Sequence, residues 1–363
     1  MGEYHPSITI GHRVKKHYMQ WHSPISQIEK YRQIPKVDLH RHLEGAIRIS
    51  TLMELARSFE ITLPLQPNLH TLVQMQPEEN QNFSNFLAKF STLRLFYRTP
   101  EIIQRIAYEA VADAAADHVL HLELIFTPVA LSRARGFEMG EVMDWVAESV
   151  QQAGRDFGIS TCLLASFNRH EPLELAEETA RLAVERISKG IVGLNLAGNE
   201  AEFSALPFAG LFQQAKKAGL AISIHAGEWG GADNVRQALE ELQADRIGHG
   251  VRILEDPQVV KLALQKGAAF EVCLTSNYQT GSITDLRQHP ITKMLDAGLI
   301  VTINTDDPSI SQISLSDEYR LALETVGLKR EALNRCILAS AKASFLPVDE
   351  KEKLVEKLNQ QFL

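Results

Sequence analysis

Four residues that lie far apart in the sequence, three histidines and one aspartate, have side chains suited to holding a divalent metal ion. His40 and His42 are separated by one residue, so on a strand both side chains point to the same face. His225 and Asp306 each end a later apolar run. Imidazole nitrogens and a carboxylate are typical ligands of zinc. A His-x-His pair alone is a weak signal, so the prediction depends on His225 and Asp306 reaching the same place.

Two further residues have side chains suited to acid–base chemistry beside such a metal. A zinc ion lowers the pKa of a bound water to about 7 and so supplies a nucleophile. Glu228 follows His225 across Gly227, which allows a sharp turn. Its carboxylic acid could protonate a ring nitrogen while water attacks the neighbouring carbon, or it could cap the next helix. His249 lies between two glycines and could orient the attacking water and stabilise the developing charge.

From residue 35 onward, short apolar runs alternate with longer helical patterns, which is typical of βαβ units. The runs are rich in β-branched residues and apolar on both faces, as buried parallel strands are. They cover residues 36–40, 120–126, 160–167, 191–198, 220–227, 245–250, 268–276 and 299–307. Eight strand–helix units predict an α/β fold, a closed (β/α)8 TIM barrel, in preference to an open doubly wound sheet.

The active site of such a barrel lies where strands end and the following loops begin. Polar residues stand near the ends of all eight runs, which would be an unusual way to fill a core. Asp306 is the expected metal ligand on the last run, and Asp307 is expected to hydrogen-bond to the substrate. In chain order the strand-end candidates are His40 and His42, Glu123, Arg169 and His170, Asn195 and Asn199, His225 and Glu228, His249, Thr275, Ser276 and Asn277, and Asp306 and Asp307.

Two segments lie outside the predicted strand–helix repeat. Residues 1–34 form an N-terminal extension that contains His5, His12, His17 and His22; their irregular spacing favours an arm packed on the barrel over a metal-binding tract. Residues 35–363 are expected to form a single domain, with a helical insertion at about 48–100 after the first strand. The insertion is rich in Leu and Phe, so its helices could pack on the barrel, cap its mouth, or do both.

The composition excludes several classes of protein. The chain has 363 residues, of which 45% are hydrophobic and 23% are charged, as in ordinary globular proteins. A net charge of −8 argues against a duplex-binding surface, but it permits a small nucleotide-like ligand. No apolar run approaches the roughly 20 residues of a membrane helix, and the N-terminus lacks an apolar signal core. We therefore expect a cytoplasmic protein with a small-molecule substrate and neither a nucleic-acid nor a membrane partner.

Seven motifs between about residues 35 and 346 resemble the adenosine deaminase family of zinc amidohydrolases: VDLHRHLEGAIR, NLAGNE, HAGEWG, RIGHGVR, EVCLTSNYQTG, HPITKMLDAG and NTDDPSI. The resemblance implies one Zn²⁺ per chain. It implies that Glu228 protonates purine N1 and that His249 orients the attacking water. By the same resemblance the metal ligands are His40, His42, His225 and Asp306, and the residues that meet the substrate are His42, Glu44, Gly198 at purine N3 and Asp307 at N7.

The reaction implied is hydrolytic deamination of adenosine or 2′-deoxyadenosine to inosine or 2′-deoxyinosine and ammonia, a step of purine salvage. Some residues depart from the family pattern. Glu44 stands where nucleoside deaminases carry a ribose-binding Asp, and in this it resembles the adenine deaminase branch. Asn195 and Asn199 replace two acids, and Ile125 replaces a common Arg, whereas EVCLTSNYQTG resembles the nucleoside branch. Adenine and a modified adenine nucleoside such as aminodeoxyfutalosine therefore remain alternative substrates.

Two other kinds of protein are less consistent with these residues. A two-metal hydrolase often needs a bridging lysine carboxylate at a mid-barrel strand end, and NLAGNE offers no lysine. A non-catalytic nucleoside-binding barrel would be indicated by the loss of a metal ligand or of Glu228, and all are present. The PCxxC signature of the cysteine-ligated zinc deaminases is absent. Cys162, Cys273 and Cys336 lie far apart and are expected to be small core residues.

Overall fold

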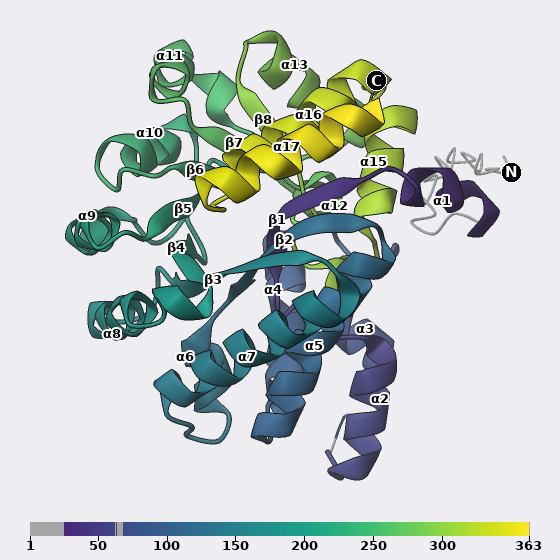
Figure 1. Cartoon of the computed structure of the whole chain (residues 1–363), viewed down its shortest axis with the longest axis vertical. Helices are drawn as coiled ribbons and strands as arrows, with labels where there is room; N and C mark the ends of the chain where they lie inside the picture. Colours follow the sequence, from purple (N-terminus) through teal and green to yellow (C-terminus); the bar gives the residue numbers. More distant parts are fainter. Residues whose placement is uncertain (1–24, 62, 64–67, 363) are drawn as a thin grey trace, which may run out of the picture.

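The computed structural model describes residues 25–61, 63 and 68–362, and its centre is one sheet of eight parallel strands (Figure 1). Each strand pairs with the next in chain order, and a parallel bridge between Arg41 and Asp306 joins the last strand end to the first. This confirms the predicted TIM barrel. The strands are β1 (Lys36–His42), β2 (Val119–Phe126), β3 (Ser160–Asn168), β4 (Ile191–Ala197), β5 (Ala221–Ala226), β6 (Arg246–His249), β7 (Ala269–Val272) and β8 (Ile300–Ile303).

One helix of the strand–helix repeat follows each strand and lies outside the sheet, as Figure 1 shows for α8 to α11. Local sequence sets their ends: α11 begins at Pro257 after the capping side chain of Asp256 and ends at Gly267, whose φ of 65° suits glycine. These helices are α5 (Pro100–Ala116), α7 (Met139–Phe157), α8 (Leu173–Val184), α9 (Ala209–Lys217), α10 (Ala232–Glu240), α11 (Pro257–Lys266), α13 (Ile291–Asp296) and α16 (Arg330–Ala343).

From β1 onward, the other helices and 3-10 turns lie in the connections between strands and these helices, or follow α16 near the end of the chain. After β1 come α2 (Ile49–Ser58), α3 (Leu69–Val73), α4 (Phe83–Leu93) and the 3-10 turn η1 (Arg94–Phe96). The remainder are α6 (Pro128–Arg133), η2 (Ile187–Lys189), η3 (Leu206–Phe208), η4 (Ile253–Glu255), α12 (Leu274–Gln279), η5 (Leu286–Gln288), α14 (Pro308–Ser311), α15 (Leu315–Glu324) and α17 (Val348–Phe362).

The segment before the barrel is described only from residue 25. Helix α1 (Ile25–Arg32) packs against α15, where Lys30 and Tyr31 both bond to Glu324. The four N-terminal histidines considered above, at positions 5, 12, 17 and 22, lie outside the described residues.

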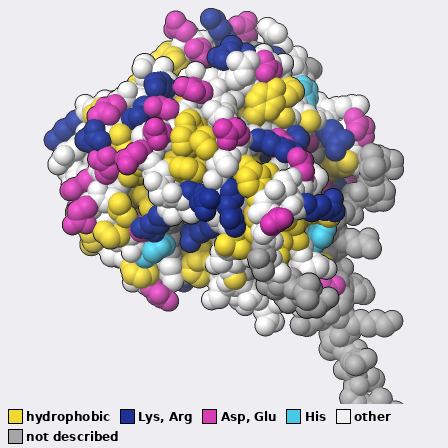
Figure 2. Space-filling view, turned by 90° about the horizontal axis from the view of Figure 1, so that it is seen from below, with side chains coloured by type: hydrophobic (Ala, Val, Ile, Leu, Met, Phe, Trp, Pro, Cys, Tyr) yellow, Lys and Arg dark blue, Asp and Glu magenta, His cyan; other side chains and the backbone are white. Residues whose placement is uncertain are grey.

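The core and the surface agree with the composition. All three cysteines are buried and unpaired, as expected of small core residues. Within the described ranges, no helix combines the length and the hydropathy needed to cross a membrane. The face seen in Figure 2 mixes acidic, basic and hydrophobic side chains, with Lys and Arg gathered toward its middle.

Candidate metal centre and active site

Four of the residues predicted as metal ligands converge at the carboxyl ends of the strands. One ligand atom from each of His40, His42, His225 and Asp306 lies within 4.8 Å of the other three, and all four residues are buried. The Nε2 atom of His42 lies 3.3 Å from Nε2 of His40 and 3.3 Å from Nε2 of His225. The Oδ1 atom of Asp306 lies 3.5 Å from Nε2 of His40 and 3.4 Å from Nε2 of His42.

These spacings fit tetrahedral zinc. Zinc–nitrogen and zinc–oxygen bonds of 2.0–2.2 Å place neighbouring ligand atoms of a tetrahedron about 3.3–3.5 Å apart. The four measured separations of 3.3–3.5 Å fall in this range. Burial would lower the pKa of His40, yet the Asp306 and Glu271 carboxylates raise it to about 10. The centre therefore strongly favours a positive charge.

Hydrogen bonds on the far side of two imidazole rings set their tautomers. Nδ1 of His40 lies 2.7 Å from Oε2 of Glu271, and Nδ1 of His225 lies 3.0 Å from the carbonyl oxygen of Leu196. Each Nδ1–H donates to its oxygen, so the Nε2 lone pair faces the convergence point once Nε2 is unprotonated, which is the form that binds a metal. Burial lowers the pKa of His42 to about 3, so this ring is neutral, the form that binds a metal.

The backbone is strained where the centre is assembled. His249 and Asp306 have φ angles of 61° and 64°, in the left-handed region that residues other than glycine seldom adopt. Strain of this kind persists only where the surrounding structure enforces it. Gly248 is required for packing, because a Cβ atom there would lie 3.0 Å from Cε1 of His40 and 3.2 Å from Cα of His225.

Glu228 and His249, the predicted catalytic pair, lie next to the metal ligands. Nε2 of His249 is 3.5 Å from Oε2 of Glu228 and 3.9 Å from Oδ2 of Asp306. Burial, reinforced by the Asp306 and Glu200 carboxylates, raises the pKa of Glu228 well above its ordinary value. The raised pKa favours the carboxylic acid form of Glu228, which can donate a proton.

Asn277 sets the tautomer of His249, the second residue predicted to act in catalysis. Its Nδ2 lies 3.1 Å from Nδ1 of His249 and donates to it. Burial lowers the pKa of His249 to about 4, so the ring is neutral and carries its single proton on Nε2. That N–H faces the centre, where it can donate to an oxygen atom.

A second carboxylate, Glu200, holds the loop that carries Glu228. Its two oxygens accept the backbone N–H groups of Gly227 at 2.9 Å, Glu228 at 2.5 Å and Trp229 at 2.6 Å. The hydroxyl of Thr280 lies 3.0 Å from Oε1 of Glu228. Neither Glu200 nor Thr280 was predicted. Glu200 belongs to the motif NLAGNE and Thr280 to the motif EVCLTSNYQTG, so these motifs are the sequence signal that could have identified both residues.

A cavity of about 260 Å³ opens onto the centre. It is lined by every residue predicted to bind the metal, to act in catalysis or to meet the substrate, with the exception of His40. Helix α4, from the insertion after β1, supplies an apolar wall, and its Phe83 ring contacts that of Trp229 beside Glu228. The lining includes His42, Glu44, Phe86, Leu87, Phe90, Arg94, Gly198, His225, Glu228, His249, Thr280, Asp306 and Asp307.

Two acids in this cavity have distinct surroundings. Oε1 of Glu44 accepts the backbone N–H of Thr127 at 2.6 Å. Oδ1 of Asp307 is buried and has no hydrogen-bond partner among the described residues. Burial, together with Asp306 and Glu44, raises the pKa of Asp307 well above its ordinary value. The raised pKa favours the protonated form of Asp307, which can donate a hydrogen bond to a ligand.

Some polar residues predicted at strand ends lie elsewhere. Glu123 is buried inside β2, where its Oε2 pairs with Arg246 at 2.6 Å, so it does not reach the cavity. Asn195 is buried inside β4 between Ser166 and Ser223. The apolar runs did not show how far each polar side chain stands from the strand end. Arg169 and Thr275 have structural bonds, to the His225 carbonyl and to Glu318 respectively, whereas His170 and Asn199 line the cavity.

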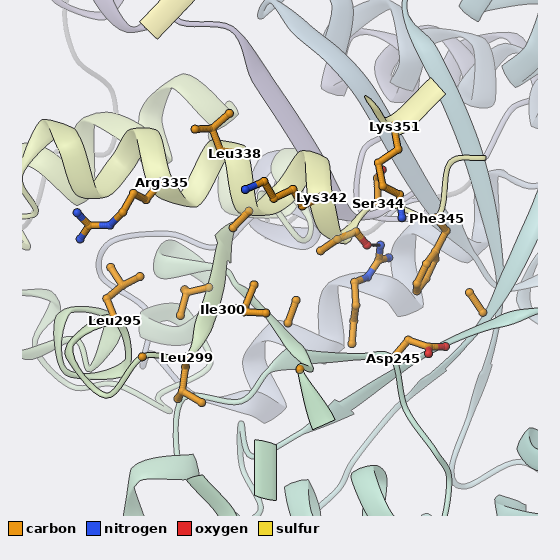
Figure 3. A pocket seen from close by; sticks show the side chains of 18 of the residues that line it. Asp245, Leu295, Leu299, Ile300, Arg335, Leu338, Lys342, Ser344, Phe345 and Lys351 are labelled. Atoms are coloured by element: carbon orange, nitrogen blue, oxygen red, sulfur yellow. Dashed lines mark hydrogen bonds between the residues drawn. The ribbon is translucent and has the colours of Figure 1, made fainter. Parts of the chain in front are cut away.

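A row of charged side chains joins the centre to the opposite end of the barrel. Arg246 donates to Oε1 of Glu271 at 2.5 Å, and Glu271 bonds in turn to His40. Although burial opposes it, Arg246 lowers the pKa of Glu271, which stays charged. Arg246 also stacks on Phe345, 3.6 Å from the ring centroid, in the wall of a cavity of about 910 Å³ where β5 to β8 begin (Figure 3).

Comparison with known proteins agrees with this geometry. A family model described as adenosine deaminase matches residues 35–361. The adenosine deaminase of Klebsiella pneumoniae is 35% identical over 332 residues, which are 90% of this chain and 98% of that protein.

Two solved structures share the fold over nearly their whole length. An adenine deaminase from Arthrobacter aurescens has a TM-score of 0.82 at 27% identity, covering 91% of this chain and 99% of that one. A zinc-bound amidohydrolase from Burkholderia ambifaria has a TM-score of 0.85 at 25% identity, covering 94% of each chain. The chain therefore belongs to the adenosine deaminase family, whose members are zinc-dependent hydrolases that act on C–N bonds.

Proposed function

We propose that this enzyme hydrolyses the 6-amino group of an adenine nucleoside, converting adenosine or 2′-deoxyadenosine to inosine or 2′-deoxyinosine and ammonia. The observation that carries the proposal is the buried Glu228, whose pKa is raised well above its ordinary value, beside three histidines and one aspartate whose ligand atoms converge. An acid and a metal centre in one small cavity suit the addition of water to an electron-poor ring carbon.

The protein groups have separate roles in this reaction. His40, His42, His225 and Asp306 would hold the zinc ion, which would supply an activated water for attack at C6. Glu228 donates a proton to N1 as the C6–O bond forms. The Nε2–H of His249 donates to the attacking oxygen and stabilises the charge that develops there.

The atoms balance without a further reactant. The C6–N bond breaks and the amino group leaves as ammonia. Of the two water protons, one is found at N1 of the product and the other leaves with ammonia. The oxygen of the water becomes the C6 oxygen of the product.

Two residues position the purine base. The raised pKa of Asp307 favours its protonated form, and its buried Oδ1 has no hydrogen-bond partner among the described residues, so the acid suits N7, a hydrogen-bond acceptor. Gly198 lines the cavity with its backbone at a φ of 92°, a conformation that favours glycine, and this lets the main chain approach N3 closely. Glu44 stands on the sugar side in this arrangement.

Adenine is the second candidate substrate, and Glu44 is the residue that favours it. Glu44 is longer than the aspartate usual at this position in nucleoside deaminases. The Arthrobacter aurescens structure, at 27% identity, is an adenine deaminase. The motif EVCLTSNYQTG and the 35% identity to the Klebsiella pneumoniae adenosine deaminase favour a nucleoside.

An ammonia-release screen over 6-aminopurines tests the proposal. The zinc-loaded protein is mixed with adenosine, 2′-deoxyadenosine or adenine, and ammonia and the 6-oxopurine product are measured together. We expect equimolar ammonia and product, with either nucleoside turned over faster than adenine. The proposal fails if the zinc-loaded protein releases no ammonia from any 6-aminopurine.

A further inference from the structure

A second cavity, lined by arginines, adjoins the active-site cavity. Its volume is about 410 Å³. The two cavities share three lining residues, Arg94, Ala130 and Asn168, so they meet along one wall. The four arginines that line the second cavity are Arg94, Arg98, Arg133 and Arg135.

Two separate segments bring these arginines together. Arg94 begins η1, directly after the apolar helix α4, and Arg98 lies just before α5. Arg133 ends α6, and Arg135 follows it. The cavity therefore lies between the insertion after β1 and the loop region after β2, at the same end of the barrel as the metal centre.

The cavity has an excess of positive charge. Its one acid, Glu171, accepts two hydrogen bonds from Arg133, at 2.7 and 2.6 Å. Among the residues that the structure describes, no carboxylate oxygen lies within 4.0 Å of a guanidinium nitrogen of Arg94, Arg98 or Arg135. Three cations beside a substrate cavity are thus left without a carboxylate.

Arg94 connects this charge to the sugar side of the active site. It lines both cavities, and Glu44 is close enough to be influenced by it. Burial raises the pKa of Glu44, while the N–H of Thr127 and the charge of Arg94 oppose that rise. In the proposed function Glu228 and Asp307 face the base, so Arg94 lies beyond the sugar.

The volumes of the two cavities also favour a substrate larger than an unmodified nucleoside. The active-site cavity alone, at about 260 Å³, is below the range of roughly 300–1,000 Å³ that is common for ligand pockets. With the adjoining cavity of about 410 Å³, the combined space lies well within this range. A nucleoside with a further substituent on its sugar would extend into both.

We propose that the preferred substrate is an adenine nucleoside with an added anionic group on its sugar, a phosphate or a carboxylate, and that Arg94, Arg98 and Arg135 bind this group. The inference rests on the proposed function, because it extends the same substrate. Guanidinium groups match the oxygens of phosphate and carboxylate with two parallel hydrogen bonds and keep their charge at any physiological pH.

A comparison of three substrates tests whether the enzyme prefers an anionic group on the sugar, and it distinguishes a phosphate from a carboxylate. The zinc-loaded enzyme is assayed with adenosine, adenosine 5′-monophosphate and adenosine 5′-carboxylate. We expect at least one anionic compound to exceed adenosine in kcat/KM by roughly tenfold or more, the size expected for hydrogen bonds to a charged group. The advantage should shrink as salt is added. A preference for the phosphate or for the carboxylate identifies the anion.

Paired variants test the arginines. In the double variant Arg98→Gln with Arg135→Gln, we expect kcat/KM for the preferred anionic substrate to fall about tenfold more than kcat/KM for adenosine. As a control, Arg155→Gln removes one positive charge from the exposed surface of α7 and should cause no such difference. Calorimetry should show inosine 5′-monophosphate, or the corresponding carboxylate, losing affinity in the double variant while inosine does not.

The results separate the two proposals. If adenosine is deaminated at least as well as both anionic compounds and the arginine variants affect all three alike, the anion site is wrong and the proposed function stands. If zinc-loaded enzyme releases ammonia from none of them, the proposed function is wrong. In that case calorimetry alone tests the anion site. The anion site is also wrong if inosine 5′-monophosphate and the corresponding carboxylate bind no more tightly than inosine.

Discussion

Oε1 of Glu200 accepts the backbone N–H of Glu228 at 2.5 Å, so one buried carboxylate positions the loop that carries another. The same side chain accepts the N–H groups of Gly227 and Trp229. Glu200 lies in the loop after β4, whereas Glu228 lies in the loop after β5. The placement of the proposed acid therefore depends on a contact between two neighbouring loops.

Replacing Glu200 by glutamine should lower kcat while the metal stays bound. An amide has only one oxygen, and its NH2 group would face backbone N–H donors, so the loop that carries Glu228 should shift. We expect kcat to fall about 10–100-fold, as for other residues that orient a site, with a smaller change in KM and an unchanged zinc content. Glu202→Gln, at an exposed position nearby, is the control and should behave as wild type. Wild-type kcat in Glu200→Gln would contradict the positioning role.

Replacing Glu228 by glutamine should abolish most turnover without releasing zinc. The amide keeps the shape of the side chain but cannot act as an acid, so we expect kcat to fall by about 10²–10⁴. In the wild type, burial raises the pKa of Glu228 and favours its acid form, so the rate should decline as the pH rises through that raised pKa. Kinetics over a pH range and metal analysis check both points. Full activity in Glu228→Gln would exclude it as the proton donor.

Two adjacent aspartates should respond differently to substitution. Asp306→Ala removes a proposed ligand atom and should lose most of the bound zinc. Asp307→Asn keeps the shape of a side chain that lies outside the cluster of ligand atoms, so it should retain zinc while KM for the nucleoside rises. Zinc per chain, measured by elemental analysis after dialysis, distinguishes the two. Equal zinc content in Asp306→Ala and wild type would remove Asp306 from the ligand set.

The carboxylate behind His40 should control metal affinity. In Glu271→Gln, the Nδ1–H of His40 loses a charged acceptor, so we expect zinc affinity to fall about 10–100-fold. Competition with a chelator measures this on the folded protein, with Glu241→Gln, an exposed position, as control. Unchanged affinity would show that the 2.7 Å contact does not influence the metal.

Much of the barrel could be predicted because its strands are buried on both faces and interrupted at regular intervals by helices. The predicted runs overlap all eight strands, and the convergence of His40, His42, His225 and Asp306 agrees with the rule that strand ends meet at one end of a barrel. That rule failed for Glu123 and Asn195, because an apolar run does not show which of its polar residues stands at the end.

The contacts that support the site could not be predicted from the sequence. Glu200 bonds to backbone groups about 28 positions along the chain, and Glu271 reaches His40 across 231 positions. Neither contact has a local pattern, because each depends on how neighbouring strands and loops align. The arginine-lined cavity is a similar case, since its residues come from two segments that are brought together only by the fold.

Deamination in ¹⁸O-labelled water tests the central claim most directly. The zinc-loaded enzyme is incubated with adenosine, and with the preferred anionic analogue, in labelled water, and the product is analysed by mass spectrometry beside an ammonia assay. The proposed hydrolysis predicts one ¹⁸O atom at C6 of each product molecule and one ammonia released for each label. Zinc-loaded enzyme that releases no ammonia, or a product without the label, would contradict it.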